Sequence, residues 1–594
     1  MTNTKDRWKH EPDDREEIDE VKRGFVKGAA LAATAAAAYS TGGGQAHADS
    51  YREEASRYIP PGQWPHHLAL EWYELPSDDP SVIEVWGYTD RMSYKPGDEV
   101  SFHVSTGAPI FDVTIYRDGG KLEKIHTAED LTGKRSATSQ DAYSTGCGWP
   151  ALYKWRLPED TRSGFYLVVF SVMRGDERVE QEAGFCVRPA SPKSKIAFML
   201  ATSTWMSYND WGGGSYYGKP GATGGALGSS EGEVGIVPRL HIHRPWARGF
   251  MRLPNSAVRW TTPAVPVRPK GQSITYPHFE FCLANGFSKW CMAGGWAAYD
   301  RHFAIWAENN DYEMDYITQH DLQANPEILN DYQCLVTVGH DEYYSWEMRE
   351  SIEKWLEAGG HFARFGGNLQ WQVRYEDQGR VQICYKGFAR KNDPVKDDPT
   401  RVRRMTNAWE SKQVNWPGAQ TFASSSTFGH LIGVGGAAPR TGGFTVYRPE
   451  HWMMADTDLY YGDSFAAEYV RFECDGIPYT FRDGLPYPTE EFGTPTNIEI
   501  VGLFPTLNRE EDRDHSITMA SQAYGDGVPI DIYDTDTITP EQREKHVRGC
   551  GILAYMPKGK GDVATAAVNE WVIGLGKDEF VDQITHNVLK QFTS

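Results

Sequence analysis

The chain has 594 residues, more than one hydrophobic core usually holds, so we expect at least two domains. Its 81 acidic residues outnumber its 60 basic residues and give a formal net charge of -21. This surplus argues against a nucleic-acid partner or an anionic membrane surface, because either would require a basic face.

Residues 1–48 have the pattern of an export signal. The segment 22–27 holds a basic pair followed by Phe and Lys, residues 28–38 are apolar and alanine-rich, and Ala46 and Ala48 frame an A-x-A cleavage site. The basic pair resembles a twin-arginine signal with Lys22 in place of the first arginine. The apolar run is shorter than the ~20 residues of a membrane span. We therefore expect a periplasmic or secreted protein without stable membrane insertion once the signal is removed.

The chain contains eight cysteines, and an even number in an exported protein permits disulfides. The nearest candidate pairs are Cys147 with Cys186 and Cys282 with Cys291. The spacing of cysteines and histidines does not match a structural zinc site.

Residues 49–79 contain several prolines and predict an irregular segment. Between residues 80 and 190 the pattern changes to short alternating or apolar runs separated by turns, as in 82–86, 100–104, 111–116 and 165–170. Their number and spacing predict an immunoglobulin-like β-sandwich. A proline-containing linker at 189–193 ends this domain.

Residues 195–594 alternate between buried-type strands and amphipathic helices. The strand 196–200 ends in a polar and aromatic loop, 203–217, and further strands follow at 314–317, 334–338 and 361–365. Residues 551–555 predict another strand and 580–592 a final helix. This order predicts an α/β domain with a mostly parallel sheet and helices on both faces. Residues 391–461 are rich in Gly, Ser and Pro and predict a long insertion.

The densest group of chemically active side chains follows the strand 334–338. It comprises His340, Asp341, Glu342, Tyr343 and Tyr344, and the next strand ends in Gly366-Gly367-Asn368. Ligands of parallel α/β sheets bind beyond the carboxyl ends of the strands, so these two turns predict a reaction centre. The structural alternative is that the acidic residues only complement the dipole of the following helix.

Several enzyme classes lack their sequence signals. Ser230 lies in a G-x-S-x-G pattern, but no apolar strand precedes it. None of the cysteines lies at a nucleophile elbow, and nucleotide-binding glycine motifs are missing. Carboxylates together with phenols, including Tyr208 in the 203–217 loop, suit a hard cation such as ferric iron. Taken singly, each tyrosine is equally well explained by packing and hydrogen bonding.

The motif at 338–345 resembles the large (β) subunit of N,N-dimethylformamidase and its relatives. The other stretches that carry the resemblance are 366–368, 371–374, 203–209, 243–245, 469–476, 570–575 and 583–589. They occur in order over most of the region from Lys195 to the C-terminus, and the upstream β-rich domain is also similar.

The resemblance implies an amidotransferase-like, flavodoxin-like α/β core that hydrolyses a small amide at one iron ion. In this family two tyrosines and one glutamate hold the iron. Tyr208 matches the first tyrosine, Glu342 the glutamate and His340 a functional histidine, while Glu473 matches a second glutamate near the iron.

The region expected to supply the second tyrosine, residues 240–246, contains none. Either His241 or His243 replaces the phenolate, or the metal is held differently, or no metal binds. We take His243 as the third metal ligand beside Tyr208 and Glu342, with Fe³⁺ as the cofactor.

Two functional hypotheses follow. The first is an exported amide hydrolase that uses a metal-activated water, with His340 and Glu473 as catalytic residues and a small amide as substrate. The alternative is a non-catalytic secreted protein that keeps the fold and binds a ligand or carbohydrate through its many tryptophans. Whether the protein forms a homo-oligomer or binds a separate small subunit stays open.

Overall fold

The computed structural model describes residues 73–218, 236–254, 257–259, 277–429, 442–470, 473–507, 530–535 and 537–594. The predicted export signal, most of the irregular segment after it and Ser230 lie outside the described residues. Among the described helices, none is both long and apolar enough to cross a membrane.

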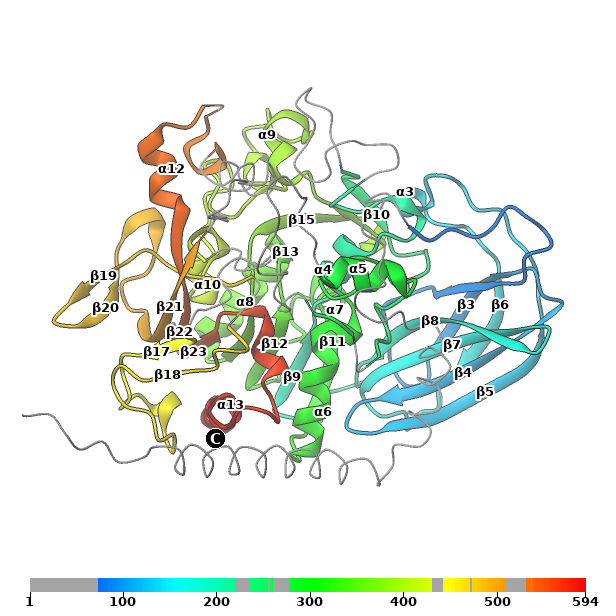
Figure 1. Ribbon diagram of the computed structural model, residues 1–594, viewed down its shortest axis with the longest axis horizontal. Helices are drawn as coiled ribbons and strands as arrows, with labels where there is room; N and C mark the ends of the chain where they lie inside the picture. The colour runs from blue at the N-terminus through cyan, green and yellow to red at the C-terminus, as the bar shows by residue number, and fades with distance from the viewer. Residues whose placement is uncertain are drawn as a thin grey trace, which may run out of the picture. The chain divides into compact units, whose positions relative to one another are not determined.

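Two β-sheets form the part of the chain that precedes residue 190 (Figure 1). One has the order β1-β3-β6 and the other the order β2-β8-β7-β4-β5. The strands are β1 Val85–Thr89, β2 Ser93–Tyr94, β3 Glu99–Thr106, β4 Ile110–Asp118, β5 Leu122–Thr132, β6 Ala151–Arg156, β7 Gly164–Arg174 and β8 Glu177–Val187. Val100, Phe102 and Val104 of β3 are buried because alternate side chains of a strand point to the same face.

A nine-stranded sheet forms the centre of the remaining chain, in the order β11-β9-β12-β14-β23-β22-β21-β17-β18. Its strands are β9 Ile196–Leu200, β11 Met314–Thr318, β12 Cys334–His340, β14 His361–Gly367, β17 Phe444–Val446, β18 Ser464–Phe465, β21 Glu499–Leu507, β22 Arg548–Lys558 and β23 Gly561–Ala566. The strands predicted at 196–200, 314–317, 334–338, 361–365 and 551–555 are therefore confirmed.

The prediction of a mostly parallel, flavodoxin-like sheet is wrong, because the sheet is mixed. From β11 to β23 the neighbours are parallel, whereas β23, β22, β21, β17 and β18 pair antiparallel. Only two residues separate β22 from β23, which is too short for the crossover that a parallel pair needs. Gly559 supplies the positive φ of 65° in that turn. The antiparallel half comes from the C-terminal third of the chain (yellow to red in Figure 1).

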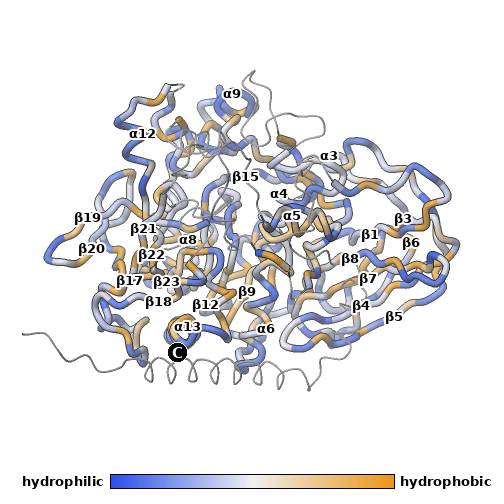
Figure 2. Tube along the Cα trace, in the orientation of Figure 1, coloured by the Kyte–Doolittle hydropathy of each residue, from blue (hydrophilic) through white to orange (hydrophobic). Residues whose placement is uncertain are grey.

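Helices cover both faces of the parallel half. Ile196, Phe198 and Leu200 of β9 belong to the apolar cluster that includes α6 Arg301–Asn309 and α13 Glu579–Thr593. Ala197 and Met199 belong to the cluster that includes α7 Gln319–Ala324 and α8 Trp346–Ala358. A strand buried on both faces has to be apolar throughout, and Figure 2 shows β9 as hydrophobic while the peripheral α12 Pro540–Val547 is hydrophilic.

The remaining elements are short. A four-stranded sheet contains β10 Arg239–His241, β16 Val381–Ile383, β15 Trp371–Glu376 and β13 Tyr343–Ser345, and a hairpin contains β19 Tyr479–Arg482 and β20 Leu485–Pro488. Short α-helices are α3 Ala142–Thr145, α4 Thr202–Tyr208, α5 Pro277–Ala284, α9 Ala389–Asn392 and α10 Ala419–Phe422. Further helical turns include η3 Trp296–Asp300 (a π-helix), η5 Lys386–Phe388 and η10 Asn569–Ile573.

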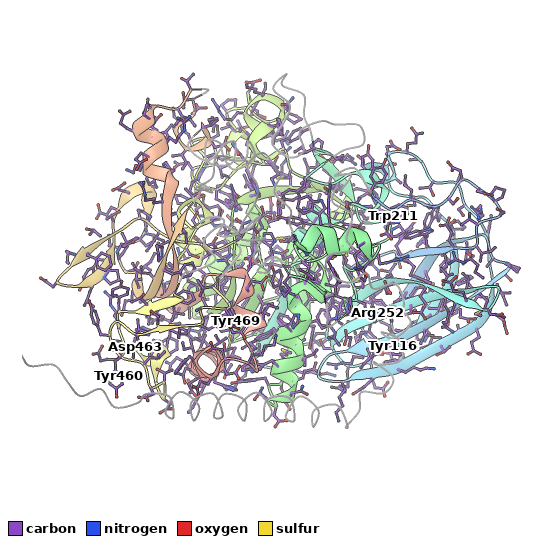
Figure 3. The ribbon with its side chains drawn as sticks, viewed as in Figure 1. Tyr116, Trp211, Arg252, Tyr460, Asp463 and Tyr469 are labelled. Atoms are coloured by element: carbon purple, nitrogen blue, oxygen red, sulfur yellow. The ribbon has the colours of Figure 1, made fainter. Side chains whose placement is uncertain are left out.

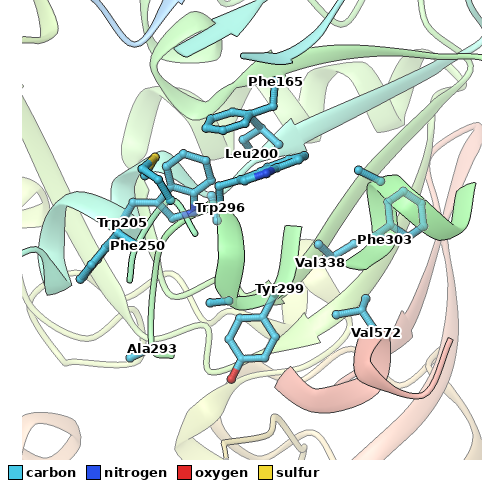
Figure 4. Close-up of a cluster of buried hydrophobic side chains, with 14 of the residues drawn as sticks. Phe165, Leu200, Trp205, Phe250, Ala293, Trp296, Tyr299, Phe303, Val338 and Val572 are labelled. Carbon is cyan, nitrogen blue, oxygen red and sulfur yellow. The ribbon is translucent and has the colours of Figure 1, made fainter. Parts of the chain in front are cut away.

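Aromatic packing and buried ion pairs join the upstream sheets to the α/β part. Phe165 of β7 stacks on Trp296 with 4.2 Å between ring centroids, close to Leu200 and Trp205 (Figure 4). Arg252, labelled in Figure 3, bridges Glu180 and Glu182 of β8. The domain boundaries predicted at residues 190 and 195 stay a prediction.

All eight cysteines are buried free thiols. The sulfur atoms of the candidate pair Cys282 and Cys291 lie 3.6 Å apart.

Candidate active site

His340 and Glu342 are placed by the end of β12, the middle strand of the parallel half. His340 is the last residue of the strand, and the residue between the two, Asp341, bonds instead to Thr337 and Tyr344. His340 Nε2 lies 3.2 Å from Glu342 Oε2, and both side chains are buried. Gly339 precedes them with a φ of 65°, and a Cβ there would lie 2.2 Å from Tyr299 Cβ, so only glycine fits this approach.

Two phenols from the loop after β9 donate hydrogen bonds to Glu342. Tyr208, the last residue of α4, donates to Glu342 Oε2 at 2.9 Å, and Tyr217 lies 3.0 Å from both carboxylate oxygens. The two phenol rings stack with 4.2 Å between centroids. Three oxygen-bearing side chains from two distant parts of the chain therefore converge on one point.

The same ring nitrogen of His340, Nε2, also faces a second carboxylate, that of Glu473. His340 Nε2 lies 2.6 Å from Glu473 Oε2, and Asn569 of η10 donates to the same carboxylate oxygen at 3.2 Å. The other ring nitrogen, Nδ1, donates to the backbone carbonyl of Ala293 at 2.8 Å. Since a carbonyl only accepts, Nδ1 carries a proton, and the proton shared with Glu473 is the one on Nε2. Asn368, which follows β14, places its side-chain amide 3.0 Å from Nε2, and only the oxygen of that amide could accept a hydrogen bond from a protonated Nε2.

The ionisation of this group is set by burial and by the paired charges. Burial alone lowers the pKa of His340, but the carboxylates of Glu473 and Glu342 outweigh it and raise that pKa to about 10. Burial raises the pKa of Glu342, but the hydrogen bond and charge of His340 hold it below its usual value. His340 is thus an imidazolium between carboxylates at neutral pH. Burial and the charge of Glu342 raise the pKa of Tyr208 well above its usual value.

A buried lysine completes the charged groups of the site. Lys386 of η5 places Nζ 3.6 Å from the ring centroid of Tyr217 and 5.0 Å from that of Trp371. The ring face of a tyrosine attracts a cation. Burial lowers the pKa of Lys386, against the opposing charge of Glu342. Its φ of 52° is one that a residue other than glycine rarely adopts.

The structure brings together four of the five predicted site residues: Tyr208, Glu342, His340 and Glu473. The fifth, His243, lies elsewhere. Its Nε2 bonds to the backbone carbonyl of Asp90 at 2.9 Å, and its ring stacks on Tyr88. His243 is therefore held against the upstream β-sheets, where it contacts backbone and aromatic groups instead of the carboxylates.

Tyr217 is the residue that the sequence analysis did not select. It is the last residue of the polar and aromatic loop 203–217, nine positions after Tyr208, whereas the second tyrosine was sought only at 240–246. The composition of that loop was a usable signal. Lys386 and Asn569 offered no comparable signal, since their contacts with the site depend on how distant segments pack.

The donors present fit a hard cation. Two phenol oxygens and one carboxylate lie within hydrogen-bonding distance of one another, and each phenol directs its proton at Glu342. A cation that displaced those two protons would meet three anionic oxygens, the ligand type that ferric iron prefers. Among the described residues, no group of three or more His, Cys, Asp or Glu side chains is arranged to hold a metal ion.

Comparison with known proteins gives one family and two relatives. A family model described as "N,N-dimethylformamidase beta subunit-like, C-terminal" matches residues 112–583. The "N,N-dimethylformamidase beta subunit" of Alcaligenes sp is 25% identical over 244 residues, which cover 38% of this chain and 28% of that protein. The protein of the same description from Paracoccus aminophilus is 24% identical over 241 residues, with the same two coverages of 38% and 28%. The match thus spans less than a third of the length of these relatives.

A solved structure of a family 123 glycoside hydrolase from Clostridium perfringens also matches weakly. It is 11% identical, covers 20% of this chain and 27% of its own, and superimposes with a TM-score of 0.10. So low a score carries no argument about fold or activity.

Proposed function

The chain belongs to the N,N-dimethylformamidase beta subunit-like, C-terminal family, and on that premise we propose that it hydrolyses the carbon–nitrogen bond of a small amide. The observation that carries the proposal is the convergence of Tyr208, Tyr217 and Glu342 beside the buried pair of His340 and Glu473.

Tyr208, Tyr217 and Glu342 are the residues that would hold a metal ion. When bound, a hard cation such as ferric iron supplies a Lewis acid that polarises an amide carbonyl and lowers the pKa of a bound water. Burial of all three side chains excludes bulk water from these oxygens and strengthens their electrostatic interactions.

His340 would act on the leaving nitrogen. An amine leaves an amide readily only after it gains a proton, and an imidazolium with a pKa of about 10 is protonated at neutral pH. The hydrogen bond from Nδ1 to Ala293 fixes the ring, and Glu473 holds the proton on Nε2 until it is transferred. Asn569 in turn orients Glu473.

We also propose that the protein is exported and that it associates with a partner subunit. The twin-arginine-like segment at 22–27 supports export. The two relatives are each described as a beta subunit, which supports a partner chain for this protein as well.

A single substitution with a matched control tests the proposal. We expect the purified protein to bind iron and to release amine or ammonia from at least one member of a panel of small amides. Tyr217→Phe removes one of the two phenol oxygens, so bound iron and activity should fall by at least about 100-fold.

Tyr216→Phe is the control, because Tyr216 is the adjacent buried tyrosine and its hydroxyl has no hydrogen-bond partner among the described residues. Iron content and activity should stay at the wild-type level in this variant. An iron-loaded wild-type protein that hydrolyses no amide in the panel would contradict the proposal.

A further inference from the structure

Two hydrogen-bond donors of buried side chains beside the site have no acceptor among the described residues. Lys386 is 4% exposed, and its Nζ has neither a hydrogen bond nor an ion pair among the described residues. Trp371 is 6% exposed, and its indole Nε1 is buried and has no hydrogen-bond partner in the part of the chain that the structure describes. Nζ lies 5.0 Å from the ring centroid of Trp371, so the two donors belong to neighbouring side chains.

Donors without acceptors lower the stability of the folded protein, so folding by itself does not explain them. A buried polar group without a partner loses its hydration, and a buried charge loses more. The ring face of Tyr217 compensates the ammonium only in part, because it accepts none of the three N–H hydrogen bonds. The positive φ of Lys386 adds backbone strain, which proteins tend to retain where a site needs the residue.

A bound trivalent cation would also change the charge balance around the ammonium of Lys386, which otherwise has Glu342 as an opposing charge. If Tyr208, Tyr217 and Glu342 held a trivalent cation, their three negative charges would neutralise it. His340 and Glu473 neutralise each other at 2.6 Å. The charge of Lys386 would then be unmatched, and an anionic ligand would balance it.

We propose that Lys386 and Trp371 bind a carboxylate of the substrate, so that the substrate class is a small amide that also carries a carboxylate group. This inference rests on the proposed amide hydrolysis. It assigns the recognition of the substrate to residues beside Tyr217, separate from the His340–Glu473 pair that acts on the leaving nitrogen.

Matched amides test the charge preference. N-acetylglycine and N-acetylglycinamide share the acetamide group and differ in the carboxylate. We expect kcat/KM of the wild-type protein to favour N-acetylglycine by at least about 10-fold, the effect of a hydrogen-bonded charge. Lys386→Met should reduce this ratio by about 10- to 100-fold, and Trp371→Phe, which removes only the N–H, should reduce it less.

Lys354→Met is the matched control, because Lys354 is exposed on α8, where it pairs with Glu350. It should keep the wild-type ratio. If the wild-type protein does not favour the anionic amide, or if Lys386→Met lowers both amides equally, the proposal is overturned, because Lys386 would then act at the amide that is cleaved.

Binding of levulinate separates this proposal from the proposed activity. Levulinate has a methylene in place of the amide nitrogen of N-acetylglycine and cannot be hydrolysed. Calorimetry should give a Kd at least about 10-fold lower for levulinate than for its neutral amide, and Lys386→Met should abolish the difference. Lysine-dependent binding of levulinate without hydrolysis of any amide would support a carboxylate site at Lys386, but it would end the proposed function and with it the assignment of an amide substrate. Hydrolysis of an amide without tighter binding of levulinate than of its neutral amide would overturn the carboxylate site and leave the proposed function standing.

Discussion

His340 and His320 take opposite protonation states although both imidazoles are buried. Burial lowers the pKa of His320 to about 4, because its surroundings offer no charge to compensate an imidazolium. For His340 the same effect is outweighed by Glu473 and Glu342, which raise the pKa to about 10. The neighbours of each histidine, and not its burial, decide whether it can donate a proton at neutral pH.

This difference predicts a pH dependence of stability. The pKa of His340 is about 10 in the folded chain and about 6.5 in an unfolded one, so its ion pairs stabilise the fold fully below about pH 6.5. The contribution is lost as the pH rises toward about 10. In chelator-treated protein, we expect the destabilisation caused by His340→Gln to shrink by about 3 kcal/mol between about pH 6.5 and about pH 9. Urea unfolding at both pH values measures it.

His320→Gln is the control. With a pKa of about 4, His320 is neutral in the folded chain across this interval. The loss of unfolding free energy caused by His320→Gln should therefore be nearly the same at both pH values. An equally constant cost for His340→Gln would show that His340 is not an imidazolium in the folded protein.

One guanidinium connects the elements that carry the site. Arg364, in the middle of β14, lies 2.5 Å from Asp475 and 3.3 Å from Asp341, and all three side chains are fully buried. Asp341 separates His340 from Glu342, and Asp475 follows Glu473 by two residues. Asp475 also accepts a hydrogen bond from the backbone N–H that follows Asn368. Arg364 thereby fixes the ends of β12 and β14 and the loop of Glu473 relative to one another.

Removing Arg364 should therefore destabilise the protein strongly. Arg364→Met leaves two buried carboxylates without their cation, and we expect it to cost about 3–5 kcal/mol of the free energy of unfolding. Arg380→Met is the matched control, since Arg380 forms an exposed pair with Asp377 and should cost no more than ~1 kcal/mol. Chemical denaturation of both variants measures the difference. Similar costs for the two would contradict the role given to Arg364.

At the scale of the molecule, the upstream β-sheets and the α/β part share buried polar contacts. Arg117 of β4 pairs with Glu308 of α6 at 2.6 Å, and Asp118 accepts hydrogen bonds from Arg301 and from the indole of Trp296. Together with the stacking of Phe165 on Trp296, these contacts oppose separate unfolding of the two parts.

We expect a single cooperative thermal transition for the described region. Glu308→Gln weakens the buried pair with Arg117 and should lower the transition midpoint by several degrees. Glu99→Gln is the control, because Glu99 pairs with Lys154 at the surface and its loss should change little. Calorimetry that resolves two transitions in the wild-type protein would contradict this expectation.

The individual elements could be predicted better than the sheet they form. β9, β12, β14, α8 and α13 were recognisable because apolar periodicity and burial are local properties of the sequence. The direction of the C-terminal strands could not be recognised in this way, since the antiparallel pairing of β22 with β21 and β23 depends on contacts between strands and on a two-residue turn. The flavodoxin-like prediction failed for that reason.

The sequence by itself determined the family, through ordered motifs such as 338–345 and 366–368, and it identified Tyr208, His340, Glu342 and Glu473 as candidates. Their roles stay predictions. Only the tertiary structure decided that Tyr217, and not His243, stands beside Glu342, and that Lys386 lies on the ring of Tyr217. The physical reason is that spacing along a chain specifies the side of a helix or strand, whereas distances between loops depend on how the strands pair and on which charges are buried together.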